Sequence, residues 1–349
     1  MTRIAVVGAG VIGTRHIEEI VACPDASLSA IVDVTSAAAK LAHDRRVPLD
    51  DSLDALLRRD RPDGVVIATP NALHAPQALA CIAAGVPTLV EKPLAHTLAD
   101  ALAICEASER ANVPVLVGHH RLHSPIVQTA CDVIDSDALG RIVGVIGSAV
   151  FHKPDAYFDE APWRRAPGGG PILINLIHEV ASLRRMIGEI VAVQAFASNA
   201  TRGFPVEDTV AMSLRFANGA LGTFLLSDTG ASAKSWEQTA QENKAYASYP
   251  DEDCYSVIGT RGSLGVPTMR IRHYEDARGR SWFEPFAARA VAFERKDPLA
   301  LQIAHFIAVI RGKMKPLVTA RDGLRNLRIV AAIAEAAKTG RAIDTDSPA

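Results

Sequence analysis

The stretch "RIAVVGAGVIG", residues 3–13, decides how the first half of this chain folds. Residues 3–7 are mostly apolar and run directly into a glycine-rich turn, after which the spacing of apolar residues becomes helical. Similar apolar runs return at residues 28–33, 64–68, 87–91 and 114–118, with amphipathic segments between them. Short strands that alternate with helices predict βαβ units and a parallel, doubly wound sheet covered on both faces.

The glycines of this turn predict a site for a dinucleotide. Gly8 permits the tight turn, Gly10 lets a pyrophosphate approach the backbone, and Gly13 allows the helix to pack closely on the strand. The phosphates would bind at the start of the helix, where Val11 and Ile12 lie and where unpaired N–H groups carry partial positive charge. A glycine turn without a ligand is the alternative interpretation.

Asp33 ends the second apolar run, 20 residues after Gly13. A carboxylate at this place accepts hydrogen bonds from the hydroxyls of an adenosine ribose. The residues that follow are "VTSAAAK", without an arginine to bind a 2′-phosphate, and the carboxylate would repel that phosphate. The pattern therefore favours NAD over NADP.

Composition and charge exclude several classes of protein. The chain has 349 residues, of which 48% are apolar and 22% charged, and a length of this size predicts two domains. Its 37 Lys and Arg residues nearly balance 39 Asp and Glu residues, which argues against binding to nucleic acid or to an anionic membrane. No apolar run is long enough for a membrane span, and no signal peptide is recognisable. The five cysteines form no CxxC pair, so we expect reduced thiols and a cytoplasmic protein.

We expect a dinucleotide-binding domain at residues 1–121 and a second domain at residues 122–349. From residue 139 onward the apolar runs are longer and predict an antiparallel sheet with a helix at residues 171–187, an α+β arrangement. An Asn-Gly pair at residues 218–219 predicts a type I′ hairpin turn between two of the strands. Two apolar helices, near residues 298–311 and 321–339, close the chain.

Two segments follow strands of the parallel sheet at the edge where such sheets bind ligands. "ATPNALHAP" places Thr69, Pro70, Asn71 and His74 along the cofactor, and "EKPLA" places Glu91 and Lys92 at its nicotinamide end. A solvated surface lysine is the alternative for Lys92.

Four segments together resemble the Gfo/Idh/MocA family, which includes glucose–fructose oxidoreductase and inositol dehydrogenases: "GAGVIG" (8–13), "ATPNALHAPQALACIAAGVPTLVEKPLA" (68–95), "VGHHRLHSP" (117–125) and "GGGPILINLIHEV" (168–180). The resemblance implies an NAD(P)-dependent oxidoreductase that acts on CH–OH groups of sugars, polyols, inositols or related compounds. It also implies a large, mostly antiparallel sheet in the second domain, through which a homodimer or homotetramer would form. Lys92 aligns with the family's catalytic lysine, and His178 aligns with its catalytic histidine.

The helix at residues 171–187 carries a polar stripe. At 100° per residue one face is apolar, and the other holds Asn175, His178, Glu179 and Ser182. The stripe faces either water or a cleft, and the preceding Gly168–Gly170 favours the close approach of a ligand. The family's inositol dehydrogenases have an aspartate four residues before the histidine, whereas this chain has Ile174. Asn175 could replace the aspartate as a hydrogen-bonding group in catalysis and substrate binding, but it supplies no charge.

The segments before this helix contain further candidates. Family members commonly carry an aromatic–arginine pair that borders nicotinamide and substrate, here Trp163 and Arg164, although a surface loop or an interface is equally compatible with "WRR". Arg165, Tyr157 and Lys153 are candidates for substrate contacts. "HHRLH", residues 119–123, lacks the further ligands that a zinc site needs, so we expect no metal and assign His120 to the cofactor and Arg121 to the substrate.

The mechanism expected from these residues has His178 accept the hydroxyl proton while Lys92 stabilises the alkoxide. Two other functions remain open: a redox-neutral, glycosidase-like enzyme that oxidises and later re-reduces its sugar, and a non-catalytic dinucleotide-binding regulator. The sequence does not identify the substrate.

Overall fold

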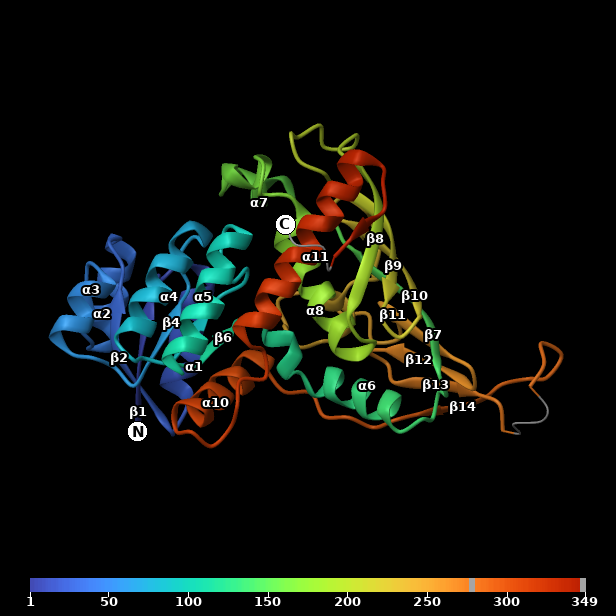
Figure 1. The fold of residues 1–349 in the computed structure, drawn as a ribbon, viewed down its shortest axis with the longest axis horizontal. Helices are drawn as coiled ribbons and strands as arrows, with labels where there is room; N and C mark the ends of the chain where they lie inside the picture. Colours follow the sequence, from blue (N-terminus) through green and yellow to red (C-terminus); the bar gives the residue numbers. More distant parts are fainter. Residues whose placement is uncertain (276–279, 346–349) are drawn as a thin grey trace. The chain divides into compact units, whose positions relative to one another are not determined.

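The computed structural model describes residues 1–275 and 280–345 and divides into two compact units (Figure 1). Unit 1 consists of Met1–His123 and Pro298–Leu327, and unit 2 consists of Ser124–Asp297 and Arg328–Ala349. The first boundary lies close to the expected residue 121. The division differs from the expectation at residues 298–327, which the sequence assigned to the second domain and which pack with unit 1.

Unit 1 is built on a parallel sheet of six strands in the order β3-β2-β1-β4-β5-β6. The strands are β1 (Thr2–Val7), β2 (Ala26–Val32), β3 (Leu49–Asp50), β4 (Gly64–Ile67), β5 (Thr88–Val90) and β6 (Val115–Val117). The five predicted strands are confirmed, and only the two-residue β3 was missed because it is too short to show a periodic pattern. The strand order reverses beside β1, so the glycine turn that follows β1 lies at the edge position where such sheets bind ligands.

Seven helical segments belong mainly to unit 1: α1 (Val11–Ala22), α2 (Ser36–Arg45), α3 (Leu53–Arg59), α4 (His74–Ala83), α5 (Leu98–Ala111), α10 (Pro298–Ile310) and the first turns of α11 (Ala320–Thr339). Two short 3₁₀ segments, η1 (Asn71–Leu73) and η2 (His120–His123), follow β4 and β6. Thr35, Ser52 and Thr97 cap α2, α3 and α5 with side-chain oxygens. The first residue of α1 follows Gly10, which offers no side chain to cap the helix.

Helix α10 belongs to unit 1 because its apolar side chains complete the core of that unit. Ile303 and Phe306 are fully buried in the same cluster as Ile4 and Val66 of the sheet. Beyond the helix, the guanidinium of Arg311 donates to the carboxylate of Asp25 at 3.0 Å. The chain therefore returns to its first unit after completing most of the second, which hydrophobic periodicity alone does not indicate.

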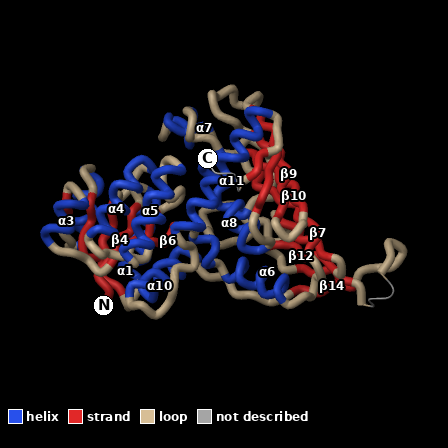
Figure 2. Tube along the Cα trace, viewed as in Figure 1, coloured by secondary structure: helices blue, strands red, loops and turns tan. Residues whose placement is uncertain are grey.

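Unit 2 is built on a sheet of nine strands in the order β14-β13-β12-β11-β7-β10-β9-β8-β15, visible as the red strands on one side of Figure 2. All neighbouring pairs are antiparallel except β7 and β10. The strands are β7 (Ile142–Val150), β8 (Ile190–Ser198), β9 (Thr209–Phe216), β10 (Leu221–Ser227), β11 (Tyr255–Gly259), β12 (Gly262–Val266), β13 (Arg270–His273), β14 (Ala287–Ala290) and β15 (Ile343–Asp344). The expected α+β fold with a large, mostly antiparallel sheet is confirmed.

The helices of unit 2 are α6 (Pro125–Asp135), α7 (Asp155–Asp159), α8 (Ile177–Met186), α9 (Trp236–Thr239) and the later turns of α11. A 3₁₀ turn, η3 (Pro162–Arg165), and a π-helical turn, η4 (Ile172–Leu176), precede α8. In Figure 1, α6 and α8 lie on the same side of the nine-stranded sheet. The predicted helix at residues 171–187 is therefore present, but its first turn is wider than an α-helical turn.

The turn between β9 and β10 differs from the predicted type I′ turn. Of its Asn-Gly pair, only Gly219 has positive φ, at 88°. The N–H of Gly219 donates to the carbonyl of Phe216 at 3.0 Å, and the N–H of Phe216 donates to the carbonyl of Ala220 at 2.9 Å. This is a type I turn followed by a glycine bulge, and the Asn218 side chain stabilises it by accepting from the N–H of Ala220 at 3.0 Å.

Candidate functional site

The glycine turn of unit 1 has the backbone geometry that a pyrophosphate needs. Gly8 has φ of 89°, and a Cβ on Gly13 would lie 1.9 Å from the carbonyl oxygen of Gly8. A Cβ on Gly10, by contrast, would meet nothing within 4 Å. The chain thus uses two glycines to close the turn and leaves open space at the third, directly before the uncapped N-terminus of α1.

Asp33 lies beside this turn and braces it. Its carboxylate accepts hydrogen bonds from the N–H groups of Ala9 and Thr35, each at 2.8 Å. Partial burial raises the pKa of Asp33, but these backbone hydrogen bonds outweigh it and leave the pKa below its ordinary value. Val11 and Val34 on either side are 88% and 84% exposed, which offers apolar surface next to a charged acceptor. These residues fit the adenosine and diphosphate parts of a dinucleotide.

His74 stabilises the turn after β4 through contacts with backbone carbonyl groups. His74 is buried, and its Nδ1 and Nε2 lie 2.8 Å from the carbonyl oxygens of Pro93 and Thr69. Burial lowers the pKa of His74, while the two carbonyl contacts oppose this effect because they favour a ring that donates from both nitrogens. Thr69 donates its hydroxyl to Gln77 at 2.7 Å, while Pro70 is exposed and Asn71 half-buried at the start of η1. We predicted that four residues here contact the cofactor. One of them, His74, instead contacts backbone carbonyl oxygens of this chain.

Glu91 is buried beneath the segment that carries Lys92. Its carboxylate lies 2.7 Å from Nε2 of His16 in α1 and accepts the N–H of Lys92 at 3.2 Å. Burial raises the pKa of Glu91, but the contact with His16 outweighs it, so the pKa lies below its ordinary value. Gly118 makes room for this carboxylate, because a Cβ there would lie 2.7 Å from Glu91 Oε1. We expected Glu91 to point at the nicotinamide end, whereas its side chain points into unit 1.

The backbone on both sides of Lys92 is therefore held in place by hydrogen bonds. Glu91 before it is tied to α1, and the carbonyl of Pro93 after it is tied to His74. Lys92 itself is half-buried, unlike its two neighbours, which are buried. The contacts of its two neighbours thus fix where the side chain of Lys92 leaves the backbone.

The histidines after β6 pack within unit 1. His119 is buried with its Nε2 3.0 Å from Nδ2 of Asn326, and the ring of His123 lies 5.1 Å from that of His305. Burial lowers the pKa of His120 to about 4 and that of His123 to about 3, so both are neutral near pH 7. Arg121 is buried, and His120 is half-buried. Within residues 1–275 and 280–345, no group of three or more His, Cys, Asp or Glu side chains is arranged to hold a metal ion.

In unit 2 three residues of the polar stripe, His178, Glu179 and Ser182, are buried, so this part of the stripe does not face water. His178 is 7% exposed and Glu179 1% exposed, and Glu179 accepts a hydrogen bond from the hydroxyl of Tyr255 in the sheet. Within the π-helical turn the neighbouring residues Leu173, Ile174 and Asn175 are all half-buried. Asn175 and His178 thus come from adjacent turns, one π-helical and one α-helical.

The three glycines before this helix are explained by packing. A Cβ on Gly169 would lie 2.3 Å from the carbonyl oxygen of Trp163, and one on Gly170 would lie 2.3 Å from the carboxylate of Glu207. Glu207 accepts the N–H of Ile172 at 2.9 Å at the start of the π-helical turn. Only Gly168, with φ of 89°, has open space around it. We expected these glycines to allow the close approach of a ligand. Two of them, Gly169 and Gly170, instead allow the close approach of Trp163 and Glu207 of this chain.

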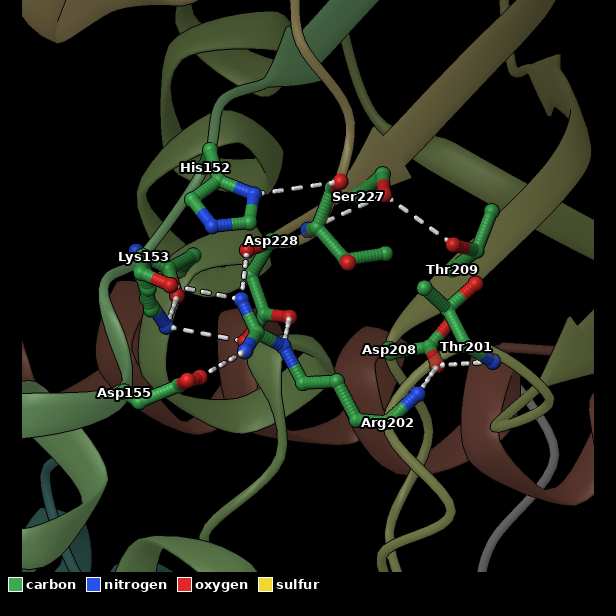
Figure 3. A network of polar contacts seen from close by, with 11 residues as sticks. His152, Lys153, Asp155, Thr201, Arg202, Asp208, Thr209, Ser227 and Asp228 are labelled. Atoms are coloured by element: carbon green, nitrogen blue, oxygen red, sulfur yellow. Dashed lines mark hydrogen bonds and ion pairs between the residues drawn. The ribbon is translucent and has the colours of Figure 1, made fainter.

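A buried network of charges supports the same helix. Figure 3 shows the side chains of Lys153, Arg202 and Asp228 converging, with Asp155 at the edge. The ammonium of Lys153 lies 3.4 Å from the carboxylate of Asp228 and donates to Oδ1 of Asn175 at 2.7 Å. Arg202 donates to the carboxylate of Asp228 at 3.0 Å and to the carbonyl of Lys153 at 2.7 Å. Arg202 and Asp228 were missed in the sequence, where the "SD" after an apolar run (227–228) was their only signal.

The aromatic and arginine side chains of residues 157–165 lie on the same unit. The guanidinium carbon of Arg164 is 3.7 Å from the centre of the Tyr157 ring, and the Lys153 ammonium is 4.9 Å from it. Trp163 is 56% exposed, and Arg165 pairs with Asp159. Tyr157 and Arg164 thus lie next to Lys153. Arg165 instead pairs with the carboxylate of Asp159.

The predicted site residues fall into two groups that the structure assembles separately. The glycine turn, Asp33, Thr69 and Lys92 belong to unit 1, and Lys153, Tyr157, Arg164, Asn175 and His178 belong to unit 2. The function of each of these residues remains a prediction. No helix in the described parts of the chain combines the length and apolarity needed to cross a membrane.

Both the N-terminal and the C-terminal part of the chain match models of known protein families. Residues 2–119 match the model of an oxidoreductase family with an NAD-binding Rossmann fold, and residues 127–265 match the GFO/IDH/MocA C-terminal domain. A 1,5-anhydro-D-fructose reductase of Ensifer adhaerens is 30% identical over 85% of this chain and 84% of its own length. A D-xylose 1-dehydrogenase (NADP(+)) of Haloferax volcanii is 24% identical over 98% and 99%. The structure of the WlbA dehydrogenase of Chromobacterium violaceum, in complex with NADH and UDP-GlcNAcA, is 26% identical, covers 98% of this chain and 95% of its own, and superposes with a TM-score of 0.78.

Proposed function

The chain belongs to the Gfo/Idh/MocA family of NAD(P)-binding oxidoreductases, and from this premise we propose that it is a dehydrogenase of a sugar, polyol, inositol or related cyclic hydroxy compound. The observation that carries the proposal is the fixation of the segment Glu91–Pro93 by His16 and His74. That arrangement holds the backbone of Lys92 in place just beyond the end of β5.

We propose the following roles for this chain's residues. A bound nicotinamide dinucleotide supplies the hydride acceptor. The N-terminus of α1 and Gly10 hold its diphosphate, and Asp33 holds its adenosine ribose. His178 accepts the proton of the substrate hydroxyl, and the ammonium of Lys92 stabilises the negative charge that develops on that oxygen. Asn175, Tyr157 and Arg164 bind the substrate in unit 2, with Arg121, Arg165, Trp163 and His120 as further candidates for contacts to substrate or cofactor.

A substrate screen at 340 nm tests this function. The protein is incubated with NAD⁺ or NADP⁺ and a panel of inositols, aldoses, sugar acids, anhydro-sugars and cyclic diols. A dehydrogenase accumulates the reduced dinucleotide with at least one of them. Consumption of a glycoside without a net change in absorbance would instead identify the redox-neutral alternative, and dinucleotide binding without any reaction would favour the regulator.

The preference for NAD is a separate proposal that rests on Asp33. We expect Asp33→Asn to lower kcat/KM with NAD⁺ and to raise it with NADP⁺, so that their ratio falls by roughly tenfold or more, because the charged acceptor for the ribose hydroxyls and the repulsion of a 2′-phosphate are both removed. Steady-state kinetics with both dinucleotides measure the ratio. An unchanged ratio in a variant of normal thermal stability would contradict the assigned role.

We propose that the exposed face of the nine-stranded sheet forms a homo-oligomer. Ile146, Phe196, Leu221 and Leu225 on β7, β8 and β10 are between 44% and 70% exposed, and residues of the same strands line a shallow hollow on the sheet. Contiguous apolar surface of this kind favours burial against a second copy. Leu225→Glu should convert the oligomer to a monomer in light scattering. Leu49→Glu, which charges a leucine of similar exposure in unit 1, serves as the control and should leave the mass unchanged.

All five cysteines are free thiols, four of them buried. Unpaired thiols fit a reducing compartment, so we propose the cytoplasm as the site of action. Cell fractionation with an antibody to the protein tests this, and recovery in a secreted or periplasmic fraction would contradict it.

A further inference from the structure

Asn175 has only one of its two amide ends occupied. Its Oδ1 accepts from the ammonium of Lys153 at 2.7 Å. Among the described residues its Nδ2 has no hydrogen-bond acceptor, and it does not belong to the buried side-chain atoms that lack a partner, so this end of the amide is accessible. Asn175 lies in the π-helical turn directly before the helix that carries His178.

The identity of the occupied end follows from chemistry. An ammonium has three hydrogen-bond donors and no acceptor, so only the carbonyl end of an amide can face it. Lys153 therefore fixes the orientation of the Asn175 amide. The NH₂ group, which can only donate hydrogen bonds, is the end that remains for a ligand.

Lys153 is itself held in place. Its side chain is 10% exposed, Asp228 lies 3.4 Å from the ammonium, and the ring of Tyr157 lies 4.9 Å from it. Arg202 donates to the carbonyl of Lys153 and to the carboxylate of Asp228, so the backbone and the counter-ion of the lysine are bound to the same guanidinium. Burial lowers the pKa of Lys153, and Asp228 and Glu237 oppose that effect by favouring the ammonium.

We propose that Lys153 is a positioning residue that turns Asn175 into a hydrogen-bond donor to the substrate, and that the enzyme thereby selects substrates with an oxygen beside the carbon that is oxidised. The inference rests on the proposed dehydrogenase function and deepens it by naming the residues that recognise the oxygen beside the reacting carbon. The oxidised hydroxyl donates its proton to His178, and the neighbouring oxygen accepts from Nδ2 of Asn175. An isolated alcohol of the same size lacks that second oxygen, so it displaces water from Nδ2 of Asn175 without replacing the hydrogen bond.

The position also accounts for the departure from the family's inositol dehydrogenases. An aspartate, which those enzymes carry nearby, accepts hydrogen bonds on both oxygens, whereas Asn175 held by Lys153 can only donate on its open side. The two arrangements therefore suit different hydroxyl orientations, even though each places a polar side chain within one turn of the histidine.

Kinetics with two matched substrates test the proposal. The polyol with the highest turnover is compared with its deoxy analogue, which lacks only the hydroxyl next to the reacting carbon. We expect the wild-type enzyme to prefer the polyol by roughly tenfold or more in kcat/KM, as one hydrogen bond to a substrate oxygen provides. Asn175→Asp keeps a partner for Lys153 but removes the donor, so the preference should disappear. Lys153→Met should reduce it through the released amide, and Lys153→Arg, which also only donates, should retain it.

A double-mutant cycle separates positioning from a general structural effect. If Lys153 acts through Asn175, Lys153→Met changes the substrate preference in the wild-type background and leaves it unchanged in Asn175→Asp. Lys234→Met, which removes an exposed lysine of the same unit, is the matched control and should change neither preference nor stability. Equal losses on both substrates in all variants would contradict the inference while leaving the dehydrogenase function intact.

A measurement without turnover covers the case in which the screen finds no substrate. The side-chain amide of Asn175 gives a pair of NMR signals that is identified by its loss in Asn175→Asp. Lys153→Met should shift this pair, because the charged donor to its carbonyl is gone, and Lys234→Met should not. Signals that do not respond to Lys153→Met would overturn the proposed orientation whether or not the protein is a dehydrogenase.

Discussion

Lys92→Met should lower kcat by about a thousandfold while dinucleotide binding is retained. Methionine has nearly the length of lysine and leaves the backbone between Glu91 and Pro93 unchanged, so the variant removes the charge and little else. Loss of a single donor to a developing oxyanion costs about a hundredfold to a thousandfold, and a charged donor in a partly buried position lies at the upper end of that range. Steady-state kinetics with the substrate found in the screen measure kcat, and fluorescence titration measures dinucleotide affinity.

Two variants accompany this measurement. Lys40→Met removes an exposed lysine in α2 and should leave kcat unchanged. Glu91→Gln should lower thermal stability more than Lys92→Met does, because it removes the charged partner of His16 from the interior of unit 1. Near-normal kcat in Lys92→Met would remove the lysine from the mechanism, even if the protein proves to be a dehydrogenase of the family.

The parallel unit was predictable because its signals are local. Buried strands read as unbroken apolar runs, and the glycine turn allows β1 to pack closely against α1 because Gly8 and Gly13 lack side chains. The course of the chain at residues 298–327 was not predictable in the same way. The apolar pattern of α10 shows that it needs a core, but Ile303 and Phe306 would fill a core in either unit equally well. Which unit it joins is decided by contacts with residues such as Ile4 and Val66, which lie more than 200 positions earlier.

The sequence predicted the candidate reactive side chains, but it did not predict the residues that hold the site in place. Lys92 and His178 stand in motifs that resemble a family, so they could be named. The residues that support the site, such as His16 beside Glu91 or Arg202 beside Lys153, meet their partners only after folding. The polar stripe of residues 175–182 shows the same limit: an ideal helical wheel assumes one α-helix, whereas the π-helical turn at Ile172–Leu176 rotates Asn175 relative to the turns that follow.

Gly13→Ala should prevent stable folding of unit 1, whereas Gly10→Ala should fold normally and lose dinucleotide binding. The methyl group on residue 13 would lie 1.9 Å from the carbonyl oxygen of Gly8 and 2.9 Å from the carbon of the same group. Both are backbone atoms at the junction of β1 and α1, so relief requires the helix to move away from the sheet. Separating α1 from the core costs several kcal/mol, since Ile17 and Ile20 on that helix are fully buried.

Gly10→Ala is the matched variant because it adds the same methyl group three residues earlier, where nothing lies within 4 Å. Its φ of −69° is accessible to alanine, so the protein without ligand should unfold at the wild-type temperature in calorimetry. The methyl group then occupies the space beside the first N–H groups of α1, and dinucleotide affinity should fall by roughly a hundredfold because the diphosphate can no longer approach the backbone. Equal destabilisation by the two variants would show that the open space at Gly10 is needed for folding. Normal affinity in Gly10→Ala would place the diphosphate elsewhere, and with it the cofactor on which the functions of Asp33 and Lys92 depend.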